Sequence, residues 1–247
     1  LEEWGVLSNP NDNNKDFSAQ EEILGDDIFG LESVLDKLVL VKKLREVRVL
    51  RGFHRITPSK EDFVQADLNK NIAWLPATEV FGEGIFISFK EKAITTWQNK
   101  YKDAIHLRLD VMQKKYNHMK LDFLPEPTSK FVLLHTLAHL LIRQLAFECG
   151  YAAASLRERI YCSNEKNPMA GILIYTADSD SEGSLGGLVR QGNKDRFIPT
   201  LLTAMQRGEW CSADPVCREL PAQGMNGLNR AACHSCSLLA ETSCVSH

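Results

Sequence analysis

The sequence predicts an α+β or mixed α/β protein, with a strand-containing N-terminal region followed by a mainly helical C-terminal domain capped by zinc. Two kinds of apolar pattern support this. Continuous or alternating apolar residues bounded by turn residues predict strands, and spacings of three or four predict helices. The third observation is that five of the seven cysteines lie after residue 210. The 44% hydrophobic and 25% charged residues are typical of a soluble globular chain, and the length of 247 residues excludes a mini-protein that needs cross-links to fold.

Charge divides the first sixty residues into two contrasting segments. Residues 1–36 contain ten acids and one lysine, and they include the run Asn9 to Asn14. We expect this part to be an acidic linker or loop. Residues 37–60 contain eight basic residues and one acid, interleaved with apolar positions. The total of −3 therefore hides a strong local contrast.

The basic stretch has two interpretations. It could contact a phosphate backbone, or it could be a solvated face that offsets the acidic segment before it. The candidate DNA contacts are Lys42, Lys43, Arg45, Arg48 and Arg51.

Residues 37–127 are expected to form a mixed strand and helix domain. Apolar runs predict strands at 38–41, 47–50 and 82–89, the last after a glycine-rich turn. Helical spacing follows over 91–119. The break at 125–129 contains two prolines and supplies an N-cap, so the boundary of the next domain is placed there.

Residues 128–247 are expected to form the second domain. Its strongest element is a helix from Lys130 to Cys149, ended by Gly150. A shorter helix over 152–160, a buried strand over 171–176 and a helix over 197–207 are expected to follow. The polar, then glycine-rich, stretch 178–188 reads as a turn that opens a helix.

The C-terminal cysteines predict a structural zinc site. A Cys-x2-Cys pair binds a tetrahedral zinc from a tight turn, and a second pair completes the site. Because four thiolates leave no open position for substrate, such a site is not catalytic. Unrelated reduced thiols, or a redox pair, are the alternatives. The predicted ligands are Cys211, Cys217, Cys233 and Cys236, with Cys244 as an alternate.

A possible polar site has two parts. His135, His139 and Arg143 recur every four residues and share one face of the predicted helix, where they could bind a metal or a phosphate. Ser184 and Gly186 lie in the glycine-rich turn, whose backbone N–H groups could cradle a phosphate. The alternatives are a polar stripe on a buried helix and a tight strand-to-helix turn.

The sequence favours a protein without enzymatic activity over an enzyme. The chain contains no P-loop motif and no nucleophile elbow, and Thr136 stands where a zincin has glutamate. The longest apolar run, 131–142, is interrupted by polar residues and short for a bilayer. No signal peptide is recognised at the start, so a cytoplasmic location without membrane contact is expected.

Several segments together resemble the DrmB family of the bacterial DISARM anti-phage system. The segments are Leu44–Phe53, Leu75–Phe86, Leu134–His139, Gly183–Leu188, Ala231–Cys236 and Glu241–Cys244. The C-terminal part is similar to the MrfA-type zinc-binding domain of DNA-repair helicases. The resemblance implies that the chain corresponds to a C-terminal portion of such a protein, that its four zinc thiolates are the predicted cysteines, and that it partners a DrmA-like superfamily 2 helicase on DNA.

Three functions follow from these observations. The first is a non-catalytic, zinc-binding accessory subunit of a helicase-containing defence complex that contributes to DNA engagement. The second is a nuclease or hydrolase that uses His135, His139 and Arg143. The third is a protein–protein scaffold without DNA contact.

Overall fold

An antiparallel sheet of five strands forms the centre of the protein, with the order β1-β2-β5-β7-β6. The computed structural model describes residues 2–10, 14–54, 63–66, 73–118, 124–176, 186–220, 228–229, 232–240 and 242–244. The strands of the sheet are β1 (Phe17–Glu22), β2 (Leu35–Val49), β5 (Ala77–Phe89), β6 (Leu156–Ser163) and β7 (Met169–Thr176). The predicted α+β class is confirmed.

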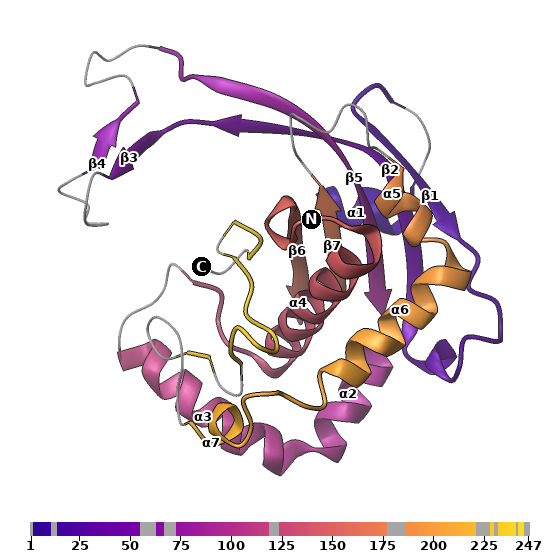
Figure 1. Ribbon diagram of the computed structural model, residues 1–247, viewed down its shortest axis with the longest axis vertical. Coiled ribbons are helices and arrows are strands. Elements are labelled where there is room, and N and C mark those ends of the chain that lie inside the picture. The colour runs from indigo at the N-terminus through magenta and orange to yellow at the C-terminus, as the bar shows by residue number, and fades with distance from the viewer. Residues whose placement is uncertain are drawn as a thin grey trace.

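Helices cover the two faces of the sheet unequally (Figure 1). The long helix α4 (Ser129–Cys149) packs on β6, β7 and α6 (Lys194–Arg207), and the short helix α1 (Glu2–Ser8) contacts β2. The remaining elements are η1 (Leu31–Ser33), β3 (Gly52–His54), β4 (Phe63–Gln65), α2 (Glu91–Lys100), α3 (Lys102–His118), η2 (Ala153–Ser155), α5 (Gly187–Gln191) and α7 (Val216–Glu219).

Strand alternation builds two cores, one on each face of the sheet. In β7, Ile172 and Ile174 belong to the core under α4 and α6. Leu173 and Tyr175 alternate with them and belong to the core that includes Leu7 of α1. Successive side chains of a strand point to opposite faces, so a continuous apolar strand is one that is covered on both sides.

A two-stranded arm extends from the sheet, where β2 and β5 continue together toward β3 and β4 (Figure 1). Pairing continues as far as Val49 opposite Ala77. We call residues 45–54, 63–66 and 73–81 the β2–β5 arm. The two strands predicted at 38–41 and 47–50 are therefore parts of one strand, β2.

Two predicted segments differ from the structure. Residues 1–36, expected as linker or loop, contain α1 and β1, because Leu7 and Ala19 are buried against the sheet. Residues 152–160, expected as a helix, form η2 and most of β6, because pairing with β7 outweighs their local helical preference. Strands from both sides of the boundary predicted near residue 128 share one sheet, since β5 pairs with β7.

The helix α4 begins and ends at the predicted residues. The Thr128 hydroxyl accepts a hydrogen bond from the Phe131 N–H, and Gly150 adopts the left-handed conformation that ends the helix. By length and composition alone α4 could span a membrane. Its apolar side chains, such as Leu141, Ile142 and Leu145, are fully buried against the sheet and α6, which accounts for this composition without a membrane.

Candidate metal centres

Four cysteine Sγ atoms converge near the C-terminus, and all lie within 4.8 Å of one another. Cys211 follows α6, Cys217 lies in α7, and Cys233 and Cys236 occupy a single turn. We call these residues the four-cysteine cluster. The structure thus brings together the four thiols predicted as ligands.

The spacing of the sulfurs fits a tetrahedral zinc ion. The Sγ–Sγ distance is 3.5 Å between Cys211 and Cys233, and 3.8 Å from Cys236 to both Cys217 and Cys233. Zn–S bonds of about 2.3 Å at tetrahedral angles place sulfurs about 3.8 Å apart. Zinc held here would cross-link the residue after α6, the helix α7 and the Cys233–Cys236 turn, and four thiolates would leave no position for a substrate.

Backbone N–H groups in both turns donate to a cysteine sulfur. The Ala213 N–H donates to Cys211 Sγ at 3.4 Å, and the Cys233 N–H donates to Cys236 Sγ at 3.2 Å. Burial raises the pKa of Cys233, but the Ser235 N–H and the neighbouring thiols outweigh it and lower that pKa to about 6. The thiolate is the form that binds metal.

Cys244 lies in a second group of potential ligands, with His135, His139 and Glu158. Their donor atoms also lie within 4.8 Å of one another. We call these four residues the mixed cluster. The two histidines come from α4, Glu158 from β6 and Cys244 from the C-terminal tail. The residue considered as an alternate zinc thiolate is therefore placed beside the histidines and not beside the other cysteines.

Burial and opposite charge compete within the mixed cluster. Burial disfavours the imidazolium form of His139, but the nearby Cys244 thiol and Glu158 carboxylate raise its pKa to about 10. The pKa of His135 is raised for the same reasons. Burial likewise disfavours the Glu158 carboxylate, but the two imidazoles lower its pKa to about 2. The metal-free group is thus held together by an ion pair inside the protein.

Arg143, one turn further along α4, supports the Cys233–Cys236 turn. Its guanidinium donates to the carbonyl oxygens of His234 at 3.1 Å and Ser235 at 3.4 Å, and it also reaches that of Leu238. The predicted stripe of two histidines and an arginine therefore faces the C-terminal segment along its whole length.

The glycine-rich turn is separate from that stripe. Gly186 N–H donates to the Glu83 carboxylate at 2.7 Å, and Leu188 N–H does so at 2.8 Å. The buried Glu83 thus occupies the donors that were considered for a phosphate at the start of α5. Ser184 lies outside the described residues.

Sequence reasoning missed both buried glutamates. Glu83 is an acid within an otherwise apolar, glycine-flanked strand. Glu158 lies two residues from both Leu156 and Ile160, so it shares the apolar face of β6 with them, next to α4. An acid at an inward-facing strand position was the signal that could have identified them. For Glu158 this signal was missed because residues 152–160 were predicted to form a helix.

Four of the five candidate DNA contacts lie on β2 and Arg51 follows that strand, but two of the five are paired with acids. Arg45 reaches Glu79 at 2.6 Å, and Arg48 reaches Glu46 at 2.5 Å. The remaining three differ. Lys42 donates to Gln20, Lys43 lies over the Phe81 ring, and Arg51 is exposed on the arm.

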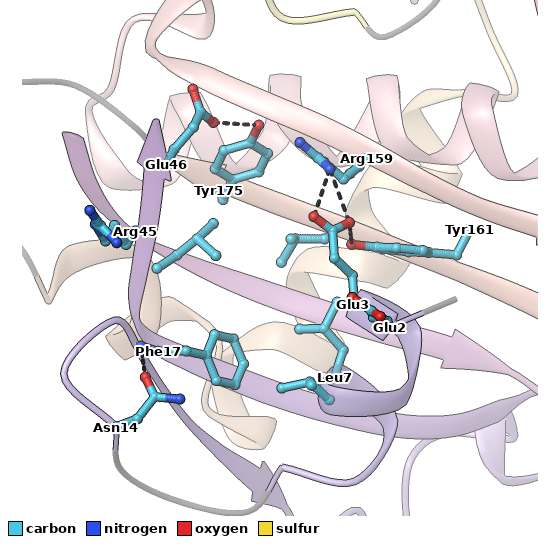
Figure 2. Close-up of a pocket in the computed structure, with 13 residues that line it drawn as sticks. Glu2, Glu3, Leu7, Asn14, Phe17, Arg45, Glu46, Arg159, Tyr161 and Tyr175 are labelled. Carbon is cyan, nitrogen blue, oxygen red and sulfur yellow. Dashed lines mark hydrogen bonds and ion pairs between the residues drawn. The ribbon is translucent and has the colours of Figure 1, made fainter. Parts of the chain in front are cut away.

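A cavity of about 320 Å³ opens on the α1 face of the sheet (Figure 2), opposite the helix α4 that carries His135 and His139. Glu3 accepts hydrogen bonds there from Arg159 at 2.7 Å and from the Tyr161 hydroxyl at 3.1 Å. Tyr175 donates to Glu46 at 3.0 Å. The polar groups that line this cavity thus pair with one another beside apolar side chains, and the cavity is separate from both clusters.

Comparison with known proteins places the four-cysteine cluster in a recognised class of domain. Residues 137–237 match the MrfA Zn-binding domain, and that range contains all four cysteines. The chain is also 38% identical over 245 residues to DISARM protein DrmB of Bacillus paralicheniformis, an alignment that covers 93% of the chain. The predicted resemblance to DrmB and to the MrfA-type domain is confirmed. The chain spans 41% of the length of that relative.

Proposed function

We propose that the protein is a non-catalytic, zinc-binding accessory subunit of a helicase-containing anti-phage defence complex in the cytoplasm. The observation that carries this proposal is the convergence of four thiols within a segment that matches a zinc-binding domain. Similarity to DISARM protein DrmB supports the defence context. The zinc ion would hold the C-terminal segment in place without acting on a substrate.

The β2–β5 arm is the surface that we assign to the helicase partner, a superfamily 2 subunit of the DrmA type. Apolar side chains stay exposed along it, and an exposed apolar patch of this kind is typical of a protein interface. The exposed residues are Val47, Val49, Leu50, Phe53, Phe63, Trp74 and Leu75.

Copurification with the helicase subunit tests this assignment. We expect Phe53→Ser combined with Trp74→Ser to abolish copurification, because it removes two large exposed aromatic groups of the arm. Trp210→Ser is the matched control, since Trp210 is 70% exposed but lies outside the arm. Equal loss in the control, or full retention in the double variant, would contradict the assignment.

DNA engagement is assigned to β2 and the residues directly after it, mainly through Lys42, Lys43 and Arg51. Arg45 and Arg48 contribute less because acids already neutralise them. Reversing the charges of Lys42, Lys43 and Arg51 should weaken DNA binding and make it less dependent on salt, since fewer counterions are released. Reversal of the exposed Lys92, Lys102 and Lys166 is the control. If the wild type binds no DNA, the scaffold function replaces this one.

A nuclease or hydrolase built on His135, His139 and Arg143 is less favoured by the geometry. The Arg143 guanidinium is used by carbonyl oxygens, and both imidazoles face Glu158. A hydrolase needs a nucleophile and an open position for substrate beside its base. If the purified wild type cleaves DNA and His135→Gln does not, the nuclease hypothesis would be favoured.

A further inference from the structure

We propose that the mixed cluster of His135, His139, Glu158 and Cys244 is a second metal site, which takes a divalent transition metal of the zinc class. It is distinct from the four-cysteine cluster, shares no residue with it and does not rest on helicase or DNA binding. The range that matches the zinc-binding domain contains His139 and Glu158 but neither His135 nor Cys244.

The donor atoms have the separations of a metal's first coordination shell. His135 Nε2 lies 3.0 Å from Glu158 Oε1 and 3.2 Å from Cys244 Sγ. His139 Nε2 lies 3.4 Å from the same carboxylate oxygen. Ligand bonds of about 2.0–2.3 Å at tetrahedral angles place donor atoms about 3.4 Å apart. One ion at the centre of the group would therefore reach all four side chains with small adjustments.

The orientation of His139 is that of a metal ligand. Its Nδ1 lies 2.7 Å from the Ser237 carbonyl oxygen, which only accepts hydrogen bonds, so Nδ1 carries the proton. In the neutral ring the lone pair is then on Nε2, which faces the cluster. His139 is 8% exposed, and its Nε2 lies on the side of Glu158. A histidine that donates one N–H to a carbonyl and offers the other nitrogen is the usual arrangement at a metal.

The charge of the Glu158 carboxylate also suits a divalent cation. The Glu158 side chain has no exposed surface and lies on the apolar face of β6, between Leu156 and Ile160. A carboxylate in such surroundings is costly unless it is paired or bound to a metal. One carboxylate and one thiolate balance the charge of a divalent ion, and two neutral imidazoles complete four donors. Nitrogen, oxygen and sulfur donors together suit zinc.

The second metal would tie three separate parts of the chain together. Its ligands join α4, β6 and the tail, where the Glu158 N–H donates to the Ser243 carbonyl at 3.1 Å. Ser237, the acceptor for His139, directly follows Cys236 of the four-cysteine cluster. A metal that fixes His139 would therefore also fix the turn that carries two of the zinc thiolates.

Metal content of the full chain tests the proposal. We expect about two zinc ions per chain in reduced, zinc-loaded wild type, and about one in Cys244→Ser and in Glu158→Gln. Cys149→Ser and Glu165→Gln are matched controls outside both clusters and should keep both ions. Wild-type protein with one zinc ion, or two ions that survive both cluster substitutions, would overturn the proposal.

X-ray absorption at the zinc edge of the wild type needs no variant, so it guards against substitutions that fail to fold. A four-cysteine site alone gives only sulfur neighbours, whereas the mixed cluster adds nitrogen and oxygen neighbours. Sulfur neighbours alone would overturn the second site. Cys217→Ser separates the two assignments: the zinc that remains should then have mainly nitrogen and oxygen neighbours. A full zinc content in Cys217→Ser would sink the four-cysteine assignment and leave this proposal standing.

Discussion

The four-cysteine cluster and the mixed cluster reach a similar geometry by opposite routes. The first is built from two short turns at the C-terminus, and each turn supplies two sulfurs by its local conformation. The second is built from a helix, a strand and the tail, and only the fold brings its donors together. A metal in the four-cysteine cluster would join two separate turns, whereas α4 and β6 already position three of the four donors of the mixed cluster.

The largest effect is expected when the four-cysteine cluster is broken. Cys233→Ser should release zinc and unfold the segment between α6 and the tail that carries Cys244, because structural zinc in small motifs contributes on the order of 10 kcal/mol to folding. Hydrogen exchange should rise strongly in residues 209–236 and little in β5 and β7. Cys149→Ser should change neither region. Uniform protection in Cys233→Ser would show that the turns hold without metal.

This contrast also explains how much of the protein could be predicted. The apolar patterns of β5, β7, α4 and α6 predict those elements correctly, and cysteine spacing predicts the four-cysteine cluster. The strand β6 could not be predicted, because its charged residues gain strand conformation only from pairing with β7. The mixed cluster depends on that strand, so Glu158 could not be joined to His135 and His139 from sequence spacing.

A smaller but still substantial effect is expected in the mixed cluster. Glu158→Ala should destabilise the metal-free protein by roughly 3–5 kcal/mol, because it leaves two partly buried imidazoles without their counter-charge. Urea unfolding in the presence of a chelator measures this loss. Glu165→Ala, in the exposed turn between β6 and β7, is the control and should lie within about 0.5 kcal/mol of wild type. Equal stability of the two variants would show that the core does not depend on the carboxylate.

The hydrogen bonds of Arg143 should contribute less to stability than either cluster does. Arg143→Ala removes guanidinium hydrogen bonds to carbonyls of the Cys233–Cys236 turn, which we expect to cost about 1–3 kcal/mol. The expected result is faster zinc release from the four-cysteine cluster with unchanged zinc content at equilibrium. Release to a chromophoric chelator measures the rate, and the exposed Arg190→Ala is the control. An unchanged rate would mean that the turn is held by its metal alone.

The smallest effect is expected from exchanging one donor for another in the mixed cluster. Cys244→Asp replaces a thiolate by a carboxylate of the same charge, and zinc accepts both donors. We expect zinc affinity at this site to fall about tenfold, which corresponds to about 1.4 kcal/mol. Cys244→Asn has nearly the same shape but no charge, so it should lose the ion. Competition with a chelator of known affinity, in a Cys217→Ser background, measures this site by itself. If the aspartate and asparagine variants bind equally, the fourth position is not a ligand, and the mixed cluster has three donors and an open side.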